Sequence, residues 1–493
     1  MTAGTVAEPR AAQAAGPDDP RRWWALVVIA GAQLMVVLDA TVVNIALPQA
    51  QHALHVSDAN RQWVVTAYTL TFGGLLLLGG RIADYWGRKR AFVAGIVGFA
   101  LASALGGLAQ NGQMLFAARA LQGAFGALLA PASLALLTVM FTSVKDRAKA
   151  FGVYGAIAGG GAGLGLVLGG ILTEYANWRW CLLVNVPVGI VAVLAALPIV
   201  RESRAHGDTR YDIPGAVLVT AGLAALVYGF TKASTDGWGA PVTVGFIAGA
   251  LVLLAAFVVV ELRSANPLLP MRILTERTRG GAYLASTLAG AGFIGAMLFL
   301  TYYLQVVLRY QPLTAGLASL PLTAGLLLTA GIATALLPRV GGTVLMATGS
   351  VIAGVGMVLL ARIGVGTAYA SHVLPAELVL GAGLGLFFVP LGNVGLVGVG
   401  EHDAGAASAV INASQQVGGS LGTALLNTVA TTATTAYLGS HVPGPLTRVQ
   451  GLVHGYVVGF LWGAALIAAA VLTVVVFIRS GRDAATPAAV PVA

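Results

Sequence analysis

The chain has 493 residues, of which 57% are hydrophobic and only 9% are charged, and its mean hydropathy is +0.86. Average soluble domains carry about 25% charged residues, so this chain has too few charges to cover a water-exposed surface, and a soluble enzyme is excluded. The net charge of +9 does not indicate nucleic-acid binding, because the basic residues lie between apolar stretches instead of gathering on one soluble face.

A helix that crosses a bilayer needs about 20 apolar residues, and the sequence contains fourteen stretches of this kind. We therefore predict an all-α membrane protein with fourteen transmembrane helices. The 66 glycines, which lie among Leu, Ala and Val, are typical of membrane helices that pack closely. The expected spans are residues 24–48, 61–80, 90–109, 113–141, 149–172, 180–200, 213–233, 241–262, 281–307, 315–337, 342–363, 372–397, 406–434 and 455–478.

The distribution of basic residues predicts on which side of the membrane each loop lies. With the N-terminus placed in the cytoplasm, twenty of the 27 Lys and Arg residues fall on the cytoplasmic side and six on the outer side, and only Arg119 lies within a span. This bias follows the positive-inside rule. We therefore expect a multi-pass protein of the cytoplasmic (inner) membrane with both termini in the cytoplasm.

The first span contains Asp39, the one acidic residue deep inside an apolar helix. A carboxylate near the bilayer centre costs at least about 2.5–3.5 kcal/mol, so it is expected to face a cavity or a partner. From a rise of about 1.5 Å per residue, Asp39 and Arg119 of the fourth span lie at similar depths. A desolvated carboxyl near a cation can exchange a proton, so Asp39 is the candidate proton carrier and Arg119 its modulator. Asn44 and Gln122 extend this polar patch as candidate cavity residues, and the alternative is a static ion pair with ordinary packing bonds.

The turn between the second and third spans reads GGRIADYWGRKR, residues 79–90. One acid and three bases within a tight turn indicate a charged latch that differs between two conformations. The alternative is a plain anchor that follows the positive-inside rule. The candidate latch residues are Gly80, Asp84, Gly87, Arg88 and Lys89.

The fifth span contains GAIAGGGAGLGLVLGG, residues 155–170. Small residues at this spacing create a smooth groove against a neighbouring helix. In a transporter such a groove is a place where domains slide or flex, although the same pattern also serves plain helix packing. The candidate residues are Gly159, Gly163, Gly165, Gly169 and Gly170.

These stretches, in this order, resemble the major facilitator superfamily and, within it, the fourteen-span drug:proton antiporters. Residues 405–425 also resemble the penultimate helix of that family, whereas Leu166 stands where its antiporter motif has proline. The matching residues are Asp39, Thr41, Val43, Asn44, Ala46, Leu47 and Pro48 in the first span, Gly80, Asp84, Gly87, Arg88 and Lys89 in the loop, Arg119, Gln122 and Gly123 in the fourth span, and Trp178, Arg179, Trp180, Asn185, Pro187 and Gly189 at the sixth.

The resemblance implies two pseudo-symmetric six-helix bundles at residues 23–200 and 281–478, an inserted helix pair at 201–280, and cytoplasmic tails at 1–22, which we expect to be disordered, and 479–493. Substrate would bind between the bundles. Asp39 would couple protons to transport with Arg119 as its modulator, and Asp84 and Arg88 would form the cytoplasmic gate. The residues expected to line the cavity then include Asn185, Asn412, Gln415 and Gln416, together with Asn44 and Gln122.

The implied function is proton-coupled export of amphipathic drugs or antibiotics by alternating access. The proton gradient supplies the energy, and we expect no cofactor, no metal and no nucleic-acid partner. The expected partners are the lipid bilayer, protons and a small amphipathic substrate, and the protein is expected to act as a monomer. The main alternative is an importer or facilitator of a small solute from the same superfamily.

A remoter alternative is an intramembrane serine protease. Residues 418–422 read GGSLG and match G-x-S-x-G, and His372 and His454 lie in or beside other spans. That motif belongs on a strand-to-helix turn, whereas these glycines are expected within a helix. An ATP-driven pump lacks support because the sequence contains no Gly-Lys pair of a phosphate-binding loop. Glu174 and Glu377 are expected at the membrane interfaces.

Overall fold

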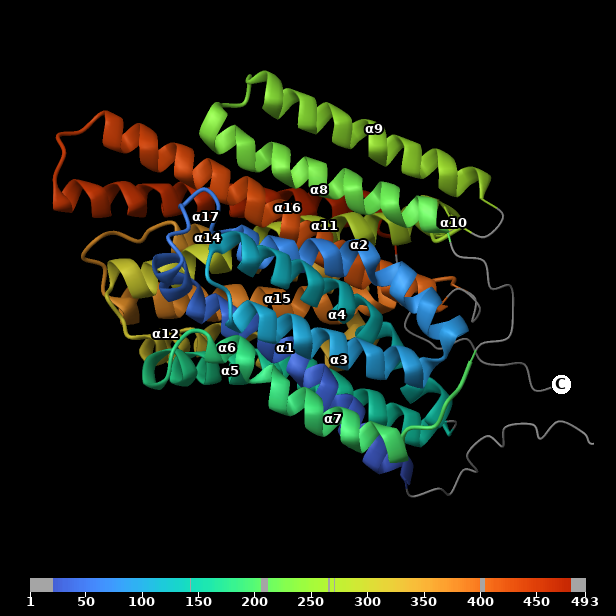
Figure 1. Ribbon diagram of the computed structural model, residues 1–493. Coiled ribbons are helices and arrows are strands. Elements are labelled where there is room, and N and C mark those ends of the chain that lie inside the picture. The colour runs from blue at the N-terminus through green and yellow to red at the C-terminus, as the bar shows by residue number, and fades with distance from the viewer. Residues whose placement is uncertain are drawn as a thin grey trace, which may run out of the picture.

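The computed structural model describes residues 21–141, 143–204, 212–264, 267–269, 271–399 and 404–479. Within these ranges the regular structure is entirely helical, and the long helices run side by side in one elongated bundle (Figure 1). The prediction of an all-α protein is confirmed. The expected tails at 1–22 and 479–493 lie almost wholly outside the described residues.

Seven helices form the first part of the chain. Their apolar sequences favour helix, because a backbone surrounded by lipid must satisfy its hydrogen bonds internally. Asn111 and Ser143 each start a helix by accepting a bond from a backbone N–H three residues on, at 2.9 and 3.2 Å. The helices are α1 (Arg21–Ala53), α2 (Trp63–Trp86), α3 (Arg88–Gly107), α4 (Gly112–Met140), α5 (Val144–Tyr175), α6 (Trp180–Leu183) and α7 (Asn185–Ile199).

The last part of the chain repeats this pattern of long apolar helices with short connections. Two π-helical turns interrupt it, a feature that often marks functional positions in helices. The segments are α11 (Arg277–Tyr302), η1 (Tyr303–Val307), α12 (Pro312–Ala318), α13 (Leu320–Val340), α14 (Gly342–Leu360), η2 (Tyr369–Val373), α15 (Leu374–Val394), α16 (Ala404–Gly439) and α17 (Pro445–Phe477).

Between these two parts, α8 (Ile213–Asp236) and α9 (Pro241–Arg263) form a hairpin along one edge of the bundle, and the short α10 (Met271–Thr275) follows (Figure 1). Helix α8 packs against α2 and α16. Thr428 of α16 donates a hydrogen bond to the Phe230 carbonyl of α8 at 2.8 Å. The hairpin is thus attached to both the first and the last part of the chain.

Twelve helical segments in the described residues are long and apolar enough to cross a membrane. They coincide with twelve of the expected spans. The two other expected spans, 149–172 and 406–434, fall on the long helices α5 and α16, in which the surroundings of several residues are not described. The count of fourteen spans therefore stays a prediction.

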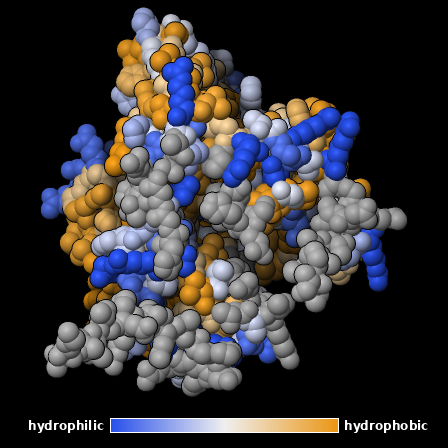
Figure 2. All heavy atoms as spheres, turned by 90° about the vertical axis from the view of Figure 1, so that its right-hand side faces the viewer, coloured by the Kyte–Doolittle hydropathy of each residue, from blue (hydrophilic) through white to orange (hydrophobic). Residues whose placement is uncertain are grey.

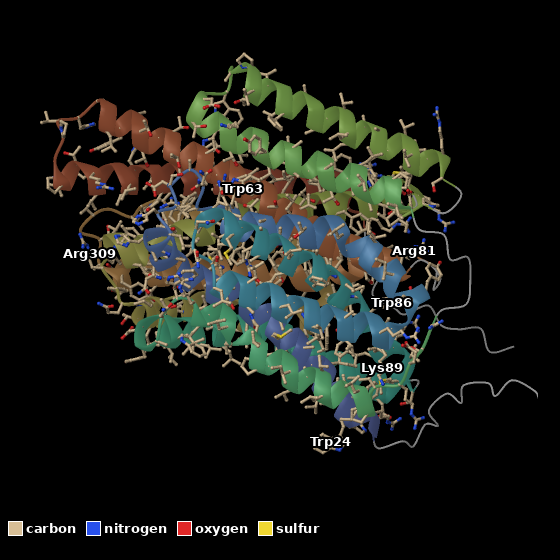
Figure 3. All side chains as sticks on the ribbon, in the orientation of Figure 1. Trp24, Trp63, Arg81, Trp86, Lys89 and Arg309 are labelled. Carbon is tan, nitrogen blue, oxygen red and sulfur yellow. The ribbon has the colours of Figure 1, made fainter. Side chains whose placement is uncertain are left out.

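The two ends of the bundle differ in chemistry. Trp24, Arg81, Trp86 and Lys89 lie at one end, whereas Arg309 lies at the other (Figure 3). Figure 2 looks onto the first end and shows many hydrophilic side chains there, with hydrophobic side chains between and around them. We call the end with Arg81 and Lys89 the basic end and the opposite one the far end.

Candidate functional site

The carboxylate of Asp39 is the centre of a buried polar cluster formed by α1, α4 and α7. Asp39 is only 1% exposed, and its Oδ2 accepts a hydrogen bond from Arg119 Nη1 at 2.5 Å. Its Oδ1 accepts bonds from Gln122 Nε2 at 2.9 Å and from Asn185 Nδ2 at 2.8 Å. The structure therefore brings together four of the residues that the sequence singles out.

Besides Asp39, three further residues contact the Arg119 side chain. Its Nη1 also donates to Gln122 Oε1 at 2.7 Å, and its Nε donates to the Val64 carbonyl oxygen at 3.0 Å. The guanidinium carbon lies 4.4 Å from the centre of the Tyr68 ring, which is a cation–π contact. Because Arg119 is 1% exposed, these groups replace the water that its charge would otherwise bind.

Asn185 connects the cluster to α3. Its Nδ2 also donates to Ser103 Oγ at 3.0 Å, and Ser103 Oγ donates to the Leu182 carbonyl oxygen at 2.7 Å. Ser103 is buried. Ser103 is not recognisable as a site residue from the sequence, because a lone serine in an apolar span cannot be distinguished from a small packing residue.

This arrangement can bind a proton only if its contacts change. The Asp39 carboxylate is enclosed by protein and neutralised by Arg119. A proton on Asp39 removes the negative charge that faces the guanidinium, and a buried charge left without a partner is strongly unfavourable. The stability of this part of the bundle therefore depends on the charge pair between Asp39 and Arg119.

The other expected cavity residues lie outside this cluster. The amide of Asn44 donates to the backbone of α1 one turn back, at 3.2 Å, and the exposed Asn412 does the same within α16, at 3.1 Å. Gln415 and Gln416 lie where α16 contacts α11 and α2 through glycines of those helices. Their role as cavity residues stays a prediction.

One face of the glycine-rich α5 packs on α1 next to Asp39. A Cβ atom on Gly165 would collide with Thr41, and one on Gly169 would lie 2.9 Å from Val42 Cα. Both α1 residues follow Asp39 within one helical turn. Gly159 lies in a part of α5 where the side-chain surroundings fall outside the description.

The other face of α5 packs on the last part of the chain. A Cβ atom on Gly163 would lie 3.2 Å from Thr323 of α13, and one on Gly170 would lie 2.6 Å from Leu313 Cα of α12. The Leu166 carbonyl also closely approaches α12. Helix α5 therefore lies between α1 and the helices α12 and α13, and its glycines make both contacts close.

Gly170→Val is expected to weaken the contact between α5 and α12, because the new side chain would overlap the backbone at Leu313. Overpacking of this kind costs about 1–3 kcal/mol, which is roughly a 5- to 150-fold shift between two conformations. Spin labels at the exposed Tyr175 and Leu317 report the distance across the far end, and Gly170→Val should populate longer distances. The control Gly152→Val places its new side chain in open space on the same helix and should keep the wild-type distance distribution. If Gly170→Val gives the same distance distribution as Gly152→Val, the close contact between α5 and α12 does not hold the far end closed.

Arg61, which precedes α2, joins the two halves of the chain at the far end. It is 3% exposed, and its Nε donates to Asn427 Oδ1 of α16 at 3.3 Å. Its guanidinium carbon lies 4.0 Å from the centre of the Tyr302 ring of α11. Nothing in the sequence distinguishes Arg61 from other basic residues beside a span, and so its role was missed.

Further hydrogen bonds close the same end between α1 or α5 and the last part of the chain. Their donors and acceptors belong to polar residues or backbone groups that lie at helix ends. The bonds run from Tyr302 to Gln51, from Gln305 Nε2 to the Ile45 carbonyl at 2.8 Å, and from Leu313 N to Glu174 Oε2 at 3.0 Å.

At the basic end, the expected latch acid pairs within its own turn. Asp84 Oδ1 accepts from Arg88 Nη2 at 2.8 Å and from Arg88 Nε at 3.1 Å. A Cβ atom on Gly80 would make an ordinary contact of 3.6 Å with Pro131, so this position does not require glycine. The role of Asp84 and Arg88 as a latch that differs between two conformations stays a prediction.

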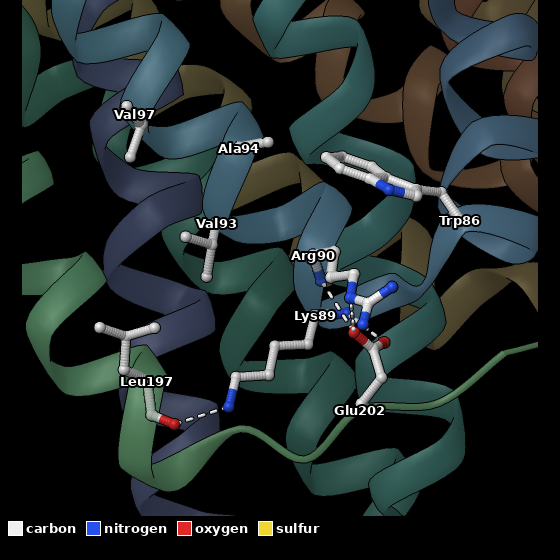
Figure 4. A pocket seen from close by; sticks show the side chains of 8 residues that line it. All are labelled: Trp86, Lys89, Arg90, Val93, Ala94, Val97, Leu197 and Glu202. Atoms are coloured by element: carbon white, nitrogen blue, oxygen red, sulfur yellow. Dashed lines mark hydrogen bonds and ion pairs between the residues drawn. The ribbon is translucent and has the colours of Figure 1, made fainter.

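Gly87 requires glycine because of its backbone conformation, and it also lies close to Glu202. Its φ of +126° disfavours other residues, and a Cβ atom there would lie 2.7 Å from the Glu202 carboxylate. Glu202 accepts from Lys89 N at 3.1 Å and from Arg90 N at 3.3 Å, and Lys89 Nζ donates to the Leu197 carbonyl at 2.6 Å (Figure 4). The turn is thus bound to the segment after α7, through an acid that the sequence analysis missed within the basic stretch RESR.

A groove of about 560 Å³ lies beside this turn on α3 and α7 (Figure 4). It is lined by apolar side chains such as Val93 and Val97 with Lys89 and Glu202 at one side, and neither Asp39 nor Arg119 contributes to it. The groove is therefore separate from the buried cluster, and we assign it no substrate.

The glycines around Ser420 serve helix packing. A Cβ atom on Gly418 or Gly422 would collide with the backbone of α11, which explains the spacing of the GGSLG stretch. His372 is exposed and contacts Ser371, its neighbour in the chain. In the described part of the chain, no group of three or more His, Cys, Asp or Glu is able to hold a metal ion.

A bundle of apolar helices with a buried ion pair, closed at one end by contacts between its two halves, is the architecture of a membrane transporter. The chain belongs to the major facilitator superfamily, whose family model matches residues 29–423. The resemblance noted in the sequence is confirmed at this level.

Two relatives cover most of the chain. The puromycin resistance protein pur8 of Streptomyces alboniger is 50% identical over 473 residues, which are 95% of this chain and 94% of that protein. The cephamycin export protein CmcT of Amycolatopsis lactamdurans is 40% identical over 425 residues, which are 85% of this chain and 87% of that protein.

Solved structures show the same fold. A bacterial homologue of the human lysosomal transporter Spinster, in an inward-facing and occupied conformation, aligns with a TM-score of 0.64 over 96% of this chain and 100% of that chain. The sequence identity is 14%, so this likeness concerns the fold alone.

Proposed function

We propose that this transporter is a proton-coupled exporter of amphipathic antibiotics, an antiporter that works by alternating access in the bacterial cytoplasmic membrane. The observation that carries the proposal is the Asp39 carboxylate, buried inside an apolar helix and bound by Arg119, Gln122 and Asn185. Ionisable groups in such positions mark ion or substrate pathways. The relatives named for puromycin resistance and cephamycin export support antibiotics as the substrate class.

In the proposed cycle, a proton on Asp39 cancels the charge that holds Arg119. The guanidinium and the neighbouring amides then change partners, and α1 shifts relative to α4. Because Thr41 and Val42 pack on the glycines of α5, this shift reaches α5 directly. The other face of α5 packs on α12 and α13, so protonation in the first half is linked to the contact that closes the far end.

The positive-inside rule supports placing the basic end in the cytoplasm. On that placement the contacts of Arg61 and of α12 close the outer side, and both chain termini are cytoplasmic. Release of drug to the outside then requires α12 to separate from α5. The proposed unit is a single chain in the bilayer.

The test is the direction and the energy source of transport. A drug-sensitive bacterial host that expresses the chain should accumulate less labelled puromycin than the empty host, and a protonophore should abolish the difference. A panel of dyes and other antibiotics measures the breadth of specificity. Higher accumulation in expressing cells would identify an importer, and a difference that persists after the protonophore would rule out proton coupling.

A further inference from the structure

The last part of the chain contains a second buried acid, Glu377, which the cycle above does not use. Glu377 lies in the first turn of α15 and is 0% exposed, and its expected place near a membrane interface stays a prediction. Its Oε1 has no hydrogen-bond partner among the residues that the structure describes. An ionised carboxylate is very unfavourable in such a place, whereas a neutral acid is tolerated. The surroundings of Glu377 therefore favour the neutral acid over the carboxylate.

The only polar contact that the structure gives Glu377 agrees with a neutral acid. Tyr369 Oη lies 3.4 Å from Glu377 Oε2 and 2.6 Å from the Ala318 carbonyl oxygen. A tyrosine hydroxyl has one proton, and the shorter contact to Ala318 uses it. The longer contact to Glu377 is therefore weak, and the carboxyl group lacks the strong donors that a buried carboxylate needs.

The internal repeat of the fold shows that this position can be apolar. Thr71 of α2 donates to the Ala120 carbonyl of α4 at 2.8 Å, and Thr329 of α13 donates to the Ala382 carbonyl of α15 at the same distance. The glycine three residues further on, Gly123 or Gly385, packs against that same threonine in each case. The two helix pairs are thus equivalent, and they align residue by residue.

Glu377 lies five residues before Ala382, and Leu115 lies five residues before Ala120. The two residues therefore occupy equivalent positions in the alignment. Leu115 is buried in the apolar core. A leucine fills the position in one repeat, whereas the other repeat carries a carboxyl group with an unsatisfied oxygen. Packing alone does not account for this glutamate.

No charged side chain of the helices around α15 lies near Glu377. Helix α14 contains no ionisable residue, and the one on α13, Arg339, lies at the opposite end of that helix. The nearest ionisable group of α11 at the far end is Tyr302, which bonds to Gln51. The η2 turn that packs on α15 also contains His372, which is exposed and contacts Ser371, and Tyr310 lies beside Tyr369 with ring centres 6.2 Å apart.

Tyr369 also connects Glu377 to the contact that closes the far end. Its acceptor, Ala318, is the last residue of α12. Helix α12 packs on α5 through Gly316 and Gly170, where backbones approach too closely for a side chain. Separation of α12 from α5 opens the α5 side of Gly316, which lies two residues before the Ala318 carbonyl that holds Tyr369.

We propose that Glu377 is a second proton-binding site of this transporter, which keeps its proton while the far end is closed and exchanges it with water when α12 separates from α5. The step is the binding or release of one proton by a carboxyl oxygen and needs no other reactant. The inference rests on the proposed proton-coupled export and adds a second site to it.

The first test counts protons per transported drug. Glu377→Gln keeps the shape of the neutral acid without its proton, and Glu377→Leu restores the residue of the other repeat. In proteoliposomes with puromycin as the probe, the pH gradient at which net drug flux reverses gives the proton count. Both variants should carry one proton fewer than the wild type, whereas Asp236→Asn, which removes an exposed acid at the end of α8, should keep the wild-type count. An unchanged count in the Glu377 variants overturns the proposal.

The second test needs no transport. Infrared spectra of the purified protein in lipid nanodiscs, without drug, should show the carbonyl band of a neutral acid at neutral pH. Both Glu377 variants should lose intensity from that band, and Asp236→Asn should keep the wild-type intensity. Spectra without this loss overturn the proposal, even where a variant does not transport. If the wild type moves puromycin without protons, the proposed function fails, and the infrared result decides about Glu377 separately.

Discussion

Asp39→Asn is expected to abolish uptake of puromycin into proteoliposomes with an acidic lumen, down to the level of protein-free vesicles. Asparagine has the size of aspartate but cannot bind or release a proton near neutral pH. The variant leaves the buried Arg119 charge without its carboxylate and is therefore expected to be less stable than the wild type. Arg119 keeps its bonds to the Val64 carbonyl and Gln122 and its contact with Tyr68, so the variant is still expected to fold and to insert. The measurement is puromycin uptake as a function of the imposed pH gradient, with size-exclusion profiles to verify folding.

The matched control is Asp236→Asn, which removes an exposed acid at the end of α8. Asp236 forms an ion pair with Lys232 at 3.5 Å, and exposed pairs contribute only about 0–1 kcal/mol. This variant should transport like the wild type. If Asp39→Asn vesicles respond to the pH gradient as wild-type vesicles do, Asp39 belongs to a static ion pair and carries no proton.

Arg119→Ala is expected to produce the largest loss of stability among these variants. It leaves the Asp39 carboxylate buried without its cation, and breaking a buried pair from one side costs about 3–5 kcal/mol. The variant should also fail to transport, because no cation remains beside Asp39 that could change its position when the charge on Asp39 changes. The free energy of unfolding, from a denaturant series in one detergent, measures the loss.

A double variant separates the ion pair from the packing of Arg119. Combining Arg119→Ala with Asp39→Asn removes the uncompensated charge, so this protein should be more stable than Arg119→Ala alone. If the double variant is less stable by the sum of the two single losses, the two side chains do not interact energetically. Protonation of Asp39 would then not affect Arg119, and the cluster could not couple protons to transport.

The sequence alone predicted the helices well, for a clear physical reason. Lipid forces the backbone into helices wherever an apolar stretch is long enough, so segment positions follow from composition. The depth of Asp39 and Arg119 followed from the helical rise, and the structure brings the two side chains into contact. The residues 79–90 predicted a tight turn between two helices, and the structure has a turn there. Glu202, which accepts hydrogen bonds from this turn, was not predicted as its partner.

The residues whose roles were not predicted are those whose partners lie on other helices, because the sequence does not show which helices are neighbours. Arg61 reads as an ordinary interfacial arginine until α11 and α16 supply Tyr302 and Asn427 as its partners. Glu377 was expected at a membrane interface, because its place near the start of a span does not reveal that α13 and α14 cover it. Periodicity offers little help in this chain, since most helices are apolar on all sides.

The most direct test of the central claim is an exchange measured without any imposed pH gradient. Purified protein in proteoliposomes that contain a pH-sensitive dye is given puromycin on the outside only. If drug and protons move in opposite directions through the Asp39 cluster, drug entry should make the lumen alkaline in wild-type vesicles and should leave it unchanged with Asp39→Asn. Puromycin that enters wild-type vesicles without any change in lumen pH would contradict the account.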